Sequence, residues 1–271
     1  MKEIISKLVP ERLSRFIKEV VLVFRKFYYK GSSYYCPVCD NSFRHLLTGG
    51  FDLPVIKEKE IIGAGRRPNI ICPYCQSTDR DRLVYLYLDN KLDIYHNKLK
   101  VLHIAPEPAL YKFLRLRKNL NYITGTKYSE GIYFHKDIES IDLLDLPFKD
   151  GEFDLFISNH VLEHINDDAK AMSEIYRVIK DNGIAILQVP ISHKIESTYE
   201  DSSITSEKMR EEHFGQFDHV RIYGKDYVTR LENAGFKVDP YSAFDDHSNK
   251  HKLEKVVLNP KEKLFVAHKE K

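Results

Sequence analysis

From residue 99 onward, short apolar runs alternate with amphipathic segments, and this alternation constrains the fold more than any other feature of the chain. The apolar spacing of helices is found in 108–116, 167–180 and 224–234, and the apolar runs are 101–105, 121–124, 153–157, 184–189, 236–238 and 264–268. The alternation predicts an α/β fold, a mostly parallel Rossmann-like sheet covered by helices on both faces. In such sheets ligands bind beyond the carboxyl ends of the strands, so a site is expected in the loops there.

The helix predicted over 167–180 has boundaries that can be read from the sequence. Asn166 is expected to cap it, and Asp167 and Asp168 place negative charge in its first turn. The pair 182–183, Asn-Gly, is expected to stop it.

All four cysteines of the chain lie in two Cys-x-x-Cys pairs, which are Cys36 with Cys39 and Cys72 with Cys75. Four thiolates can enclose a zinc ion tetrahedrally, and 32 residues between the pairs leave room for a ribbon and a loop. A closed four-cysteine site has no open position, so the zinc is expected to be structural. Two redox-active cysteine pairs are the alternative.

Composition narrows the class of protein. The chain has 271 residues and a formal net charge of +2, so no strong basic field argues for nucleic acid. No apolar run approaches the roughly 20 residues that span a bilayer. Charged residues also interrupt the first apolar stretch, unlike in a signal peptide. A cytoplasmic location is therefore expected.

Two further segments carry a resemblance to a known family. Residues Asp145–Ile165 and Glu174–Gly183 resemble class I S-adenosylmethionine-dependent methyltransferases of the ubiquinone/menaquinone-biosynthesis type. A narrower similarity to bacterial methyltransferases with a zinc ribbon covers Tyr35–Cys39, Cys72–Cys75, Arg80–Leu83, Val101–Glu107 and Phe214–Gly224. The expected organisation is an N-terminal helical segment (1–30), a zinc-ribbon module (31–78) and a methyltransferase domain (79–271) with an insertion at about 191–221.

The resemblance implies S-adenosylmethionine as cofactor and assigns residues to it. Ala105 and Glu107 occupy the loop that approaches the methionine end, Thr126 lies where the ribose is held, and the remaining positions are Asp137, Ile138 and Asn159. Two features depart from the family pattern. The first loop has no Gly-x-Gly, and Thr126 replaces an acid that would make stronger, charge-assisted hydrogen bonds to the ribose hydroxyls.

Methyl transfer to a hydroxyl group needs a base, and histidine is a common choice. We expect His219 in the insertion and His160 after the fourth strand to carry the catalysis. Three further polar residues of the insertion are expected to bind the substrate: His213, Gln216 and Arg221, whose guanidinium suits a carboxylate or phosphate. The alternative is a polar lid held by internal salt bridges.

Three functions remain open on the sequence. The favoured one is methylation of a small-molecule or glycan acceptor. An RNA methyltransferase would use the zinc ribbon for RNA binding, with positive charge from Arg66, Arg67, Arg80 and Arg82. A non-catalytic methyltransferase-like scaffold would explain the missing glycines and Thr126. The amphipathic stripe within residues 1–30 indicates a helix that packs on the body of the protein or, alternatively, lies on a membrane or a partner.

Overall fold

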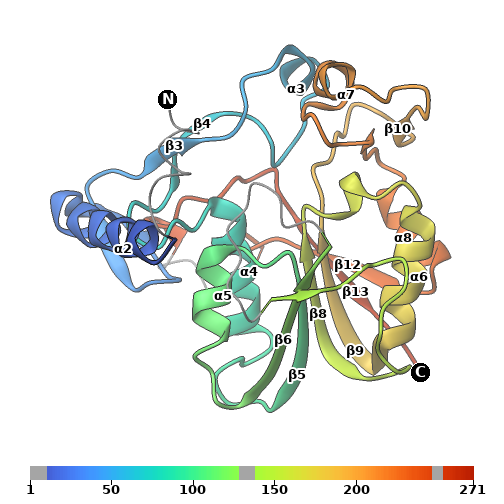
Figure 1. Ribbon diagram of the computed structural model, residues 1–271, viewed down its shortest axis with the longest axis horizontal. Helices are drawn as coiled ribbons and strands as arrows, with labels where there is room; N and C mark the ends of the chain where they lie inside the picture. The colour runs from blue at the N-terminus through green and yellow to red at the C-terminus, as the bar shows by residue number, and fades with distance from the viewer. Residues whose placement is uncertain (1–10, 128–137, 246–252) are drawn as a thin grey trace.

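The computed structural model describes residues 11–127, 138–245 and 253–271 (Figure 1). Its centre is a seven-stranded sheet in the order β12-β13-β9-β8-β5-β6-β7. The strands are β5 (Leu99–Ile104), β6 (Leu120–Thr126), β7 (Glu139–Ser140), β8 (Phe153–Asn159), β9 (Ile179–Gln188), β12 (Lys237–Tyr241) and β13 (Leu264–His268). Neighbours from β9 to β7 pair in parallel, while β13 pairs antiparallel with both β9 and β12. The predicted α/β, Rossmann-like fold is confirmed.

Helices cover both faces of this sheet, because successive side chains of its central strands are apolar on either side. Val101 of β5 packs in a core with α4 (Asp79–Asn90) and α5 (Pro108–Leu114). The next residue, Leu102, faces the opposite core with α6 (Asp168–Val178) and α8 (Tyr227–Asn233). The unbroken apolar runs of the sequence therefore belong to strands that are buried on both faces of the sheet.

Both predicted boundaries of the helix over 167–180 are corrected by the structure. The capping side chain is Asp167, which accepts a hydrogen bond from the backbone N–H of Lys170, and not Asn166. The helix ends at Val178, and Asn182-Gly183 lies inside β9, where the pairing with β8 shifts register. The turn signal was real, but it marks an irregularity within a strand, at which Asn182 has a positive φ of 62°.

The first part of the chain folds as small hairpins beside the sheet. β1 (Lys30–Cys36) pairs with β2 (Asn41–Phe43), and β3 (Leu47–Gly49) pairs with β4 (Arg67–Ile71). Helix α2 (Glu11–Tyr28) precedes them and lies at the side of the molecule (Figure 1). Most of its apolar side chains are exposed, with Leu22 buried, so its stripe does not pack on the body as the favoured expectation held.

Within the described residues, no helix is both long and apolar enough to cross a membrane.

The polar insertion has elements of its own, β10 (Tyr199–Glu200), α7 (Glu207–Phe214) and β11 (Arg221–Ile222). Helix α7 lies beside α3 (Pro54–Glu58), which belongs to the N-terminal part of the chain (Figure 1). Phe214 of α7 and Ile56 of α3 share a small apolar core. Two segments far apart in the sequence thus meet above the carboxyl ends of the strands, and together they roof the space below.

Candidate active site

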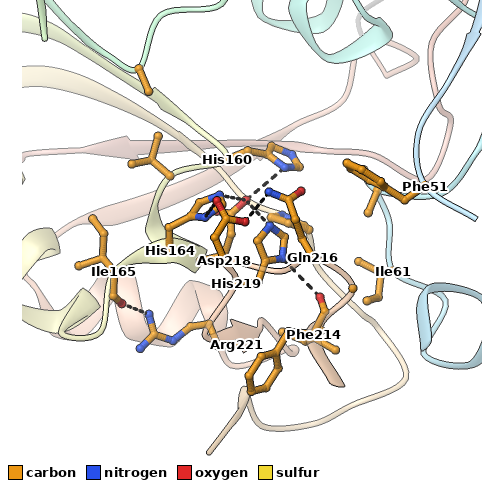
Figure 2. Close-up of a pocket in the computed structure, with 18 of the residues that line it drawn as sticks. Phe51, Ile61, His160, His164, Ile165, Phe214, Gln216, Asp218, His219 and Arg221 are labelled. Atoms are coloured by element: carbon orange, nitrogen blue, oxygen red, sulfur yellow. Dashed lines mark hydrogen bonds and ion pairs between the residues drawn. The ribbon is translucent and has the colours of Figure 1, made fainter. Parts of the chain in front are cut away.

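A cavity of about 710 Å³ lies between the carboxyl ends of the strands and this roof. Its floor includes Ala105 after β5, Thr126 at the end of β6 and His160 after β8. Phe51 and Gly63 line it from the N-terminal part, and Gln216 to His219 line it from the insertion (Figure 2). The volume lies within the range of about 300–1,000 Å³ typical of small-molecule sites.

One end of the cavity has the position expected for the cofactor. Ala105 adopts a positive φ of 48°, a conformation that glycine enters more easily, so the backbone makes the tight turn although the glycines are absent. Beside Thr126, the Nζ of Lys127 lies 2.6 Å from the Oδ2 of Asp142, and both residues line the cavity. Asp142 is an acidic group near this end that the sequence did not suggest, and the ion pair with Lys127 contributes to lowering the pKa that burial alone would raise.

The predicted cofactor residues divide into two groups. Ala105 and Thr126 line the cavity, whereas Glu107, Ile138 and Asn159 are not among its lining residues, and Asp137 lies outside the described residues. Glu107 turns to His103, with 3.1 Å between its Oε2 and the Nε2 of that ring. Burial would raise the pKa of Glu107, but the hydrogen bond with His103 keeps it below its usual value.

Asn159 presents a different situation. It is 6% exposed, and its side chain lies close enough to Glu107 for a hydrogen bond that helps to lower the pKa of that carboxyl. Buried amides are almost always fully hydrogen-bonded, and the strict hydrogen-bond geometry leaves capacity of this one open. Its place at the end of β8, beside the cavity, fits the expected contact with a cofactor.

The other end of the cavity holds a cluster of histidines around one carboxylate. The Oε1 of Glu163 lies 3.3 Å from the Nδ1 of His160, 4.0 Å from the Nε2 of His164 and 3.9 Å from the Nε2 of His219. Figure 2 shows the three histidines close together. The short 3-10 helix Leu162–His164 supplies two of these groups, and His219 comes from the insertion. A hydrogen bond of 2.9 Å from the N–H of Val220 to the carbonyl of Glu163 fastens the insertion to that helix.

Burial and neighbouring charges determine the electrostatics of this cluster. Burial lowers the pKa of His160 to about 4, and the charge of Arg80 adds to the effect. Burial would raise the pKa of Glu163, yet the surrounding histidines lower it to about 2. Burial likewise opposes the protonation of His164, but Asp218 raises its pKa above the usual value. The carboxylate of Glu163 is therefore ionised across the physiological range of pH.

His160 also has an unusual backbone. Its φ is 54°, in the left-handed region that few residues other than glycine adopt. Gly63, whose missing side chain would come within 3.2 Å of the imidazole ring, packs directly against it. Strained backbone of this kind is concentrated at functional sites, which agrees with the catalytic role expected of His160.

The three residues predicted to bind substrate are placed differently. Gln216 lines the cavity and donates a 2.7 Å hydrogen bond to Asp218. His213 is exposed on α7 and shares a 2.9 Å hydrogen bond with the hydroxyl of Tyr199. The structure brings Gln216 to the cavity and leaves His213 outside it.

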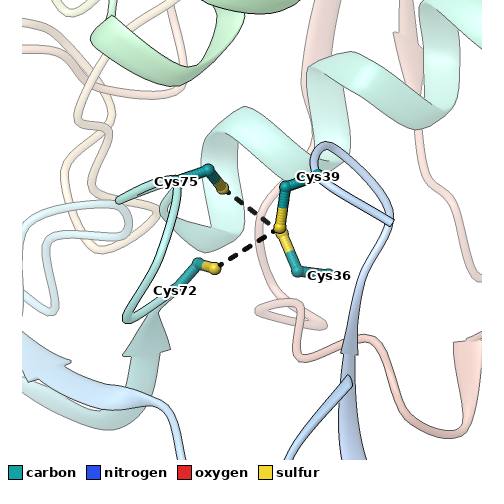
Figure 3. Close-up of side chains that lie close together, drawn as sticks. All are labelled: Cys36, Cys39, Cys72 and Cys75. Atoms are coloured by element: carbon teal, nitrogen blue, oxygen red, sulfur yellow. Dashed lines mark hydrogen bonds between the residues drawn. The ribbon is translucent and has the colours of Figure 1, made fainter. Parts of the chain in front are cut away.

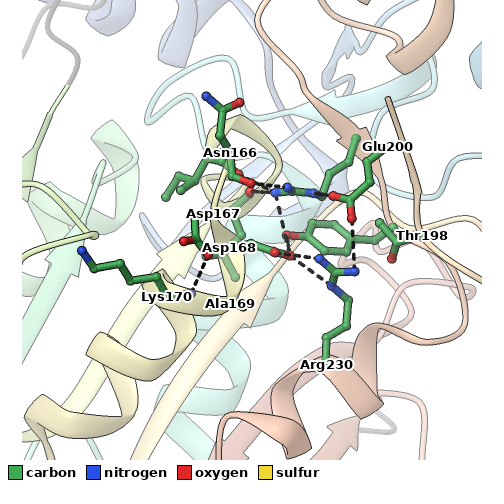
Figure 4. Close-up of polar contacts among 12 residues, drawn as sticks. Asn166, Asp167, Asp168, Ala169, Lys170, Thr198, Glu200 and Arg230 are labelled. Atoms are coloured by element: carbon green, nitrogen blue, oxygen red, sulfur yellow. Dashed lines mark hydrogen bonds and ion pairs between the residues drawn. The ribbon is translucent and has the colours of Figure 1, made fainter. Parts of the chain in front are cut away.

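Arg221 borders the cavity, but its guanidinium is engaged elsewhere. It is 3% exposed and donates hydrogen bonds to the carbonyls of Leu162 and Asn166, at 3.1 and 2.8 Å, and to Glu200 at 2.8 Å. Asp168 and Arg230 complete this network (Figure 4). Arg221 thus ties the insertion to the loop after β8, and the geometry favours a structural role over substrate binding.

The four cysteines converge at the ends of the two hairpins (Figure 3). Their sulfur atoms all lie within 4.8 Å of one another, with 3.6 Å from Cys36 to Cys75 and 3.8 Å from Cys39 to Cys72. Four thiolates about 2.3 Å from one zinc ion stand about 3.8 Å apart in a tetrahedron. The Oγ of Ser77 lies 3.1 Å from the Cys36 sulfur, as an outer hydrogen-bonding group would. The cluster fits a zinc ion.

Several site residues were missed or undervalued by the sequence reasoning. Glu163 lies between the histidines His160 and His164 in the chain, but nothing in the sequence marks it as buried. Arg80 and Gly63 line the cavity from a segment assigned to the zinc ribbon or its border. The available signal for Glu163 was its spacing, because residues 160, 163 and 164 can share one side of a single helical turn.

Part of the chain is similar to known methyltransferases. Residues 94–187 match the family described as "Methyltransferase domain". A "probable S-adenosylmethionine-dependent methyltransferase" of Mycolicibacterium smegmatis is 26% identical over 43% of this chain and 44% of its own length. Ajmaline N-methyltransferase of Rauvolfia serpentina is 29% identical over 38% of this chain and 30% of its own length. The chain spans less than half the length of these curated relatives.

Solved structures resemble the fold at low sequence identity. A SAM-dependent methyltransferase from Archaeoglobus fulgidus covers 72% of this chain and 96% of its own, with 14% identity and a TM-score of 0.44. The matched region contains β5 to β9 and the loops that form the floor of the cavity. Residues 94–187 are thus similar to a methyltransferase domain, and the cofactor and reaction of this chain belong to the proposal below.

Proposed function

We propose that this protein transfers the methyl group of S-adenosylmethionine to a small-molecule or glycan acceptor. One observation carries the proposal. A single cavity is lined at one end by the loops after β5 and β6, where the cofactor is expected, and at the other by a buried cluster of histidines. Cofactor and acceptor would thus meet in one enclosed space, and holding two reactants at close range supplies much of the rate of such a displacement.

In this proposal the residues of the chain divide the work. The bound cofactor would supply an electrophilic methyl group on a sulfonium ion. Ala105, Thr126 and Asn159 contact the cofactor, with Asp137 and Ile138 carried over from the family resemblance. His160 and His219 are the candidates for accepting the proton of the acceptor, and Gln216 is a candidate for binding it. The roof formed by α3 and α7 covers part of this space and would limit the access of water to it.

The four cysteines form the second part of the proposal, a structural zinc site. Their tetrahedral spacing and the serine beside them support it. Reduced cysteines that hold a metal fit the cytoplasmic location expected from the sequence. The subtype with an N-terminal zinc ribbon, similar to ubiquinone/menaquinone-biosynthesis methyltransferases, also belongs to this proposal.

The arginines near the cysteines do not favour the RNA-methylating alternative. Arg82 is fully buried and donates hydrogen bonds to the carbonyls of Ile70, Ser77 and Val257. Arg67 is paired with the buried Asp79. Two of the four arginines thus serve the fold itself, so the positive surface that would contact a phosphate backbone is much reduced.

A titration with S-adenosylmethionine and S-adenosylhomocysteine tests the cofactor part. Calorimetry on zinc-loaded protein is expected to give micromolar binding of both compounds at one site per chain, and Asp137→Ala is expected to weaken it. Folded protein that binds neither compound would support the scaffold alternative and contradict our proposal. RNA binding that weakens steeply with salt would favour the RNA alternative.

Thr126 allows the site to be tested in both directions. Thr126→Asp is expected to tighten cofactor binding by about tenfold, since a hydrogen bond from a hydroxyl to a charged group is worth about 1–2 kcal/mol more than a neutral one. Thr126→Asn, of the same shape without the charge, is the matched control and is expected to change little. Equal affinities for Thr126→Asp and Thr126→Asn in the same titration would place the ribose elsewhere.

A further inference from the structure

Glu163 is a buried carboxylate with few partners. Its side chain is 1% exposed, the Nδ1 of His160 lies 3.3 Å from its Oε1, and its Oε2 has no hydrogen-bond partner in the part of the chain that the structure describes. Burying a charge without compensation is so costly that buried carboxylates are paired, hydrogen-bonded or bound to a metal. The groups that face Glu163 are three imidazole rings, at 3.3 to 4.0 Å from its Oε1.

Two of these rings are held in orientation by contacts of their Nδ1 atoms, on the side away from Glu163. The Nδ1 of His164 lies 3.2 Å from the Oδ2 of Asp218, and the Nδ1 of His219 donates a hydrogen bond of 3.3 Å to the carbonyl of Phe214. Both contacts place the ring proton on Nδ1 and leave the lone pair of Nε2 directed at Glu163. Histidines that bind metals have this arrangement, in which a carboxylate or carbonyl holds the ring nitrogen that does not coordinate.

We propose that Glu163, His164 and His219 bind a divalent transition-metal ion at the acceptor end of the cavity. One ligand atom from each residue already lies within 4.8 Å of the others. Ligand atoms at about 2.1 Å from one ion stand about 3.0–3.4 Å apart, so the cluster has to close by about an ångström. His160, beside Glu163, lies on the edge of this site.

The ligand set defines the class of metal. Two imidazoles and one carboxylate, without sulfur, suit Mn²⁺, Fe²⁺ or Zn²⁺, whereas the soft four-cysteine site selects zinc. Three protein ligands leave positions open for other ligands, and all three residues line the cavity. The site is therefore distinct from the cysteine cluster in ligand chemistry, and it is of the catalytic type, in contrast to a closed structural site.

A metal here would specify the acceptor, an inference that rests on the proposed methyl transfer. A hydroxyl oxygen bound to the ion loses its proton at lower pH, because the ion stabilises the negative charge. With His219 binding the ion and no longer a candidate base, the proton would pass to His160 or to solvent. The oxygen would form the bond to the methyl carbon, and the carbon–sulfur bond would break to leave a neutral thioether. The acceptor class is then an oxygen nucleophile, favoured when a second oxygen can chelate the same ion.

Manganese titration followed by electron paramagnetic resonance tests the site without any acceptor. Protein loaded with one equivalent of zinc is titrated with Mn²⁺ alone, and the loss of the free-ion signal measures binding. We expect one Mn²⁺ per chain. Glu163→Gln and His219→Gln are expected to weaken binding more than about 100-fold, and Asp218→Asn by about 10–100-fold, the usual loss for an outer partner.

His213→Ala is the matched control, because this histidine belongs to the same insertion but is exposed and outside the cluster. It is expected to bind Mn²⁺ as the unaltered protein does. Should Glu163→Gln fail to fold, His219→Gln decides the question. Folded protein that takes up no Mn²⁺, or variants that bind it unchanged, would overturn the metal site. S-adenosylhomocysteine binding, measured in parallel, reports on the cofactor proposal separately.

Discussion

Replacing Cys36 and Cys72 together by serine is expected to remove stoichiometric zinc and to lower the melting temperature by more than about 5 °C. The hairpins around the cysteines have only a small apolar core of their own, whose buried residues are Cys36, Cys72, Phe43 and Leu46. Zinc binding energy in such modules is folding energy, about 10–16 kcal/mol in zinc-finger peptides. Even a third of that loss corresponds to about 6–10 °C in a chain of this size.

The same variant is expected to weaken cofactor binding, although no cysteine lines the cavity. Ile70 and Ile71, which do line it, are the last residues of β4 and directly precede Cys72, so a disordered module would displace this wall of the cavity. Ser77→Ala is the control, since it removes the hydrogen bond to the Cys36 sulfur and leaves all four ligands. It is expected to retain one zinc per chain with reduced affinity. Metal analysis and scanning calorimetry decide the matter, and a double variant with unchanged melting would contradict a structural zinc.

The fold could be predicted because its strands and helices follow from patterns between residues that are close in the sequence. Apolar runs such as 184–189 and the stripe of α6 reflect strands buried on both faces and a helix buried on one, and these patterns are periodic in the chain itself. The errors arose where local and tertiary signals compete. Asn182-Gly183 is a strong turn signal, but β9 continues through it, and the pairing with β8 only shifts register there.

The site was predictable only in part. The family resemblance implied that Ala105 and Thr126 lie at the cofactor and His160 in the methyl-transfer pocket, and all three line the cavity, whereas Glu107 and Asn159 do not. Whether a polar side chain of the insertion faces the cavity or the fold depends on contacts between distant segments. Arg221 reads in the sequence as an anion-binding residue, yet carbonyls of the loop after β8 engage its donors.

For the same reason, the importance of Asp168 could not be seen from the sequence. It was expected to provide helix-start charge, a contribution of only about 0.3–1 kcal/mol. In the structure it is 3% exposed, accepts a 2.8 Å hydrogen bond from the hydroxyl of Tyr223 and lies 2.6 Å from Arg230 (Figure 4). A side chain 62 residues away in the sequence determines its role.

Asp168→Ala is therefore expected to lower the free energy of unfolding by about 3–5 kcal/mol, measured by denaturant unfolding. Removing one partner of a buried ion pair leaves the other charge uncompensated, and here both Arg221 and Arg230 face the gap. Because Arg221 is two residues from His219, Mn²⁺ binding is expected to weaken as well. A loss below about 1 kcal/mol would mean that the network behaves as a solvent-exposed pair.

Combining Asp168→Leu with Arg230→Met provides the sharper comparison. If the loss in Asp168→Ala comes from an uncompensated charge, then removing Arg230 as well, with an apolar side chain in each place, recovers part of the stability, because apolar pairs replace buried ion pairs at little cost. Asp168→Asn, which keeps the shape and one acceptor oxygen, is expected to lie between Asp168→Ala and the unaltered protein. A double variant that is less stable than Asp168→Ala would assign the loss to packing around Tyr223 and not to charge.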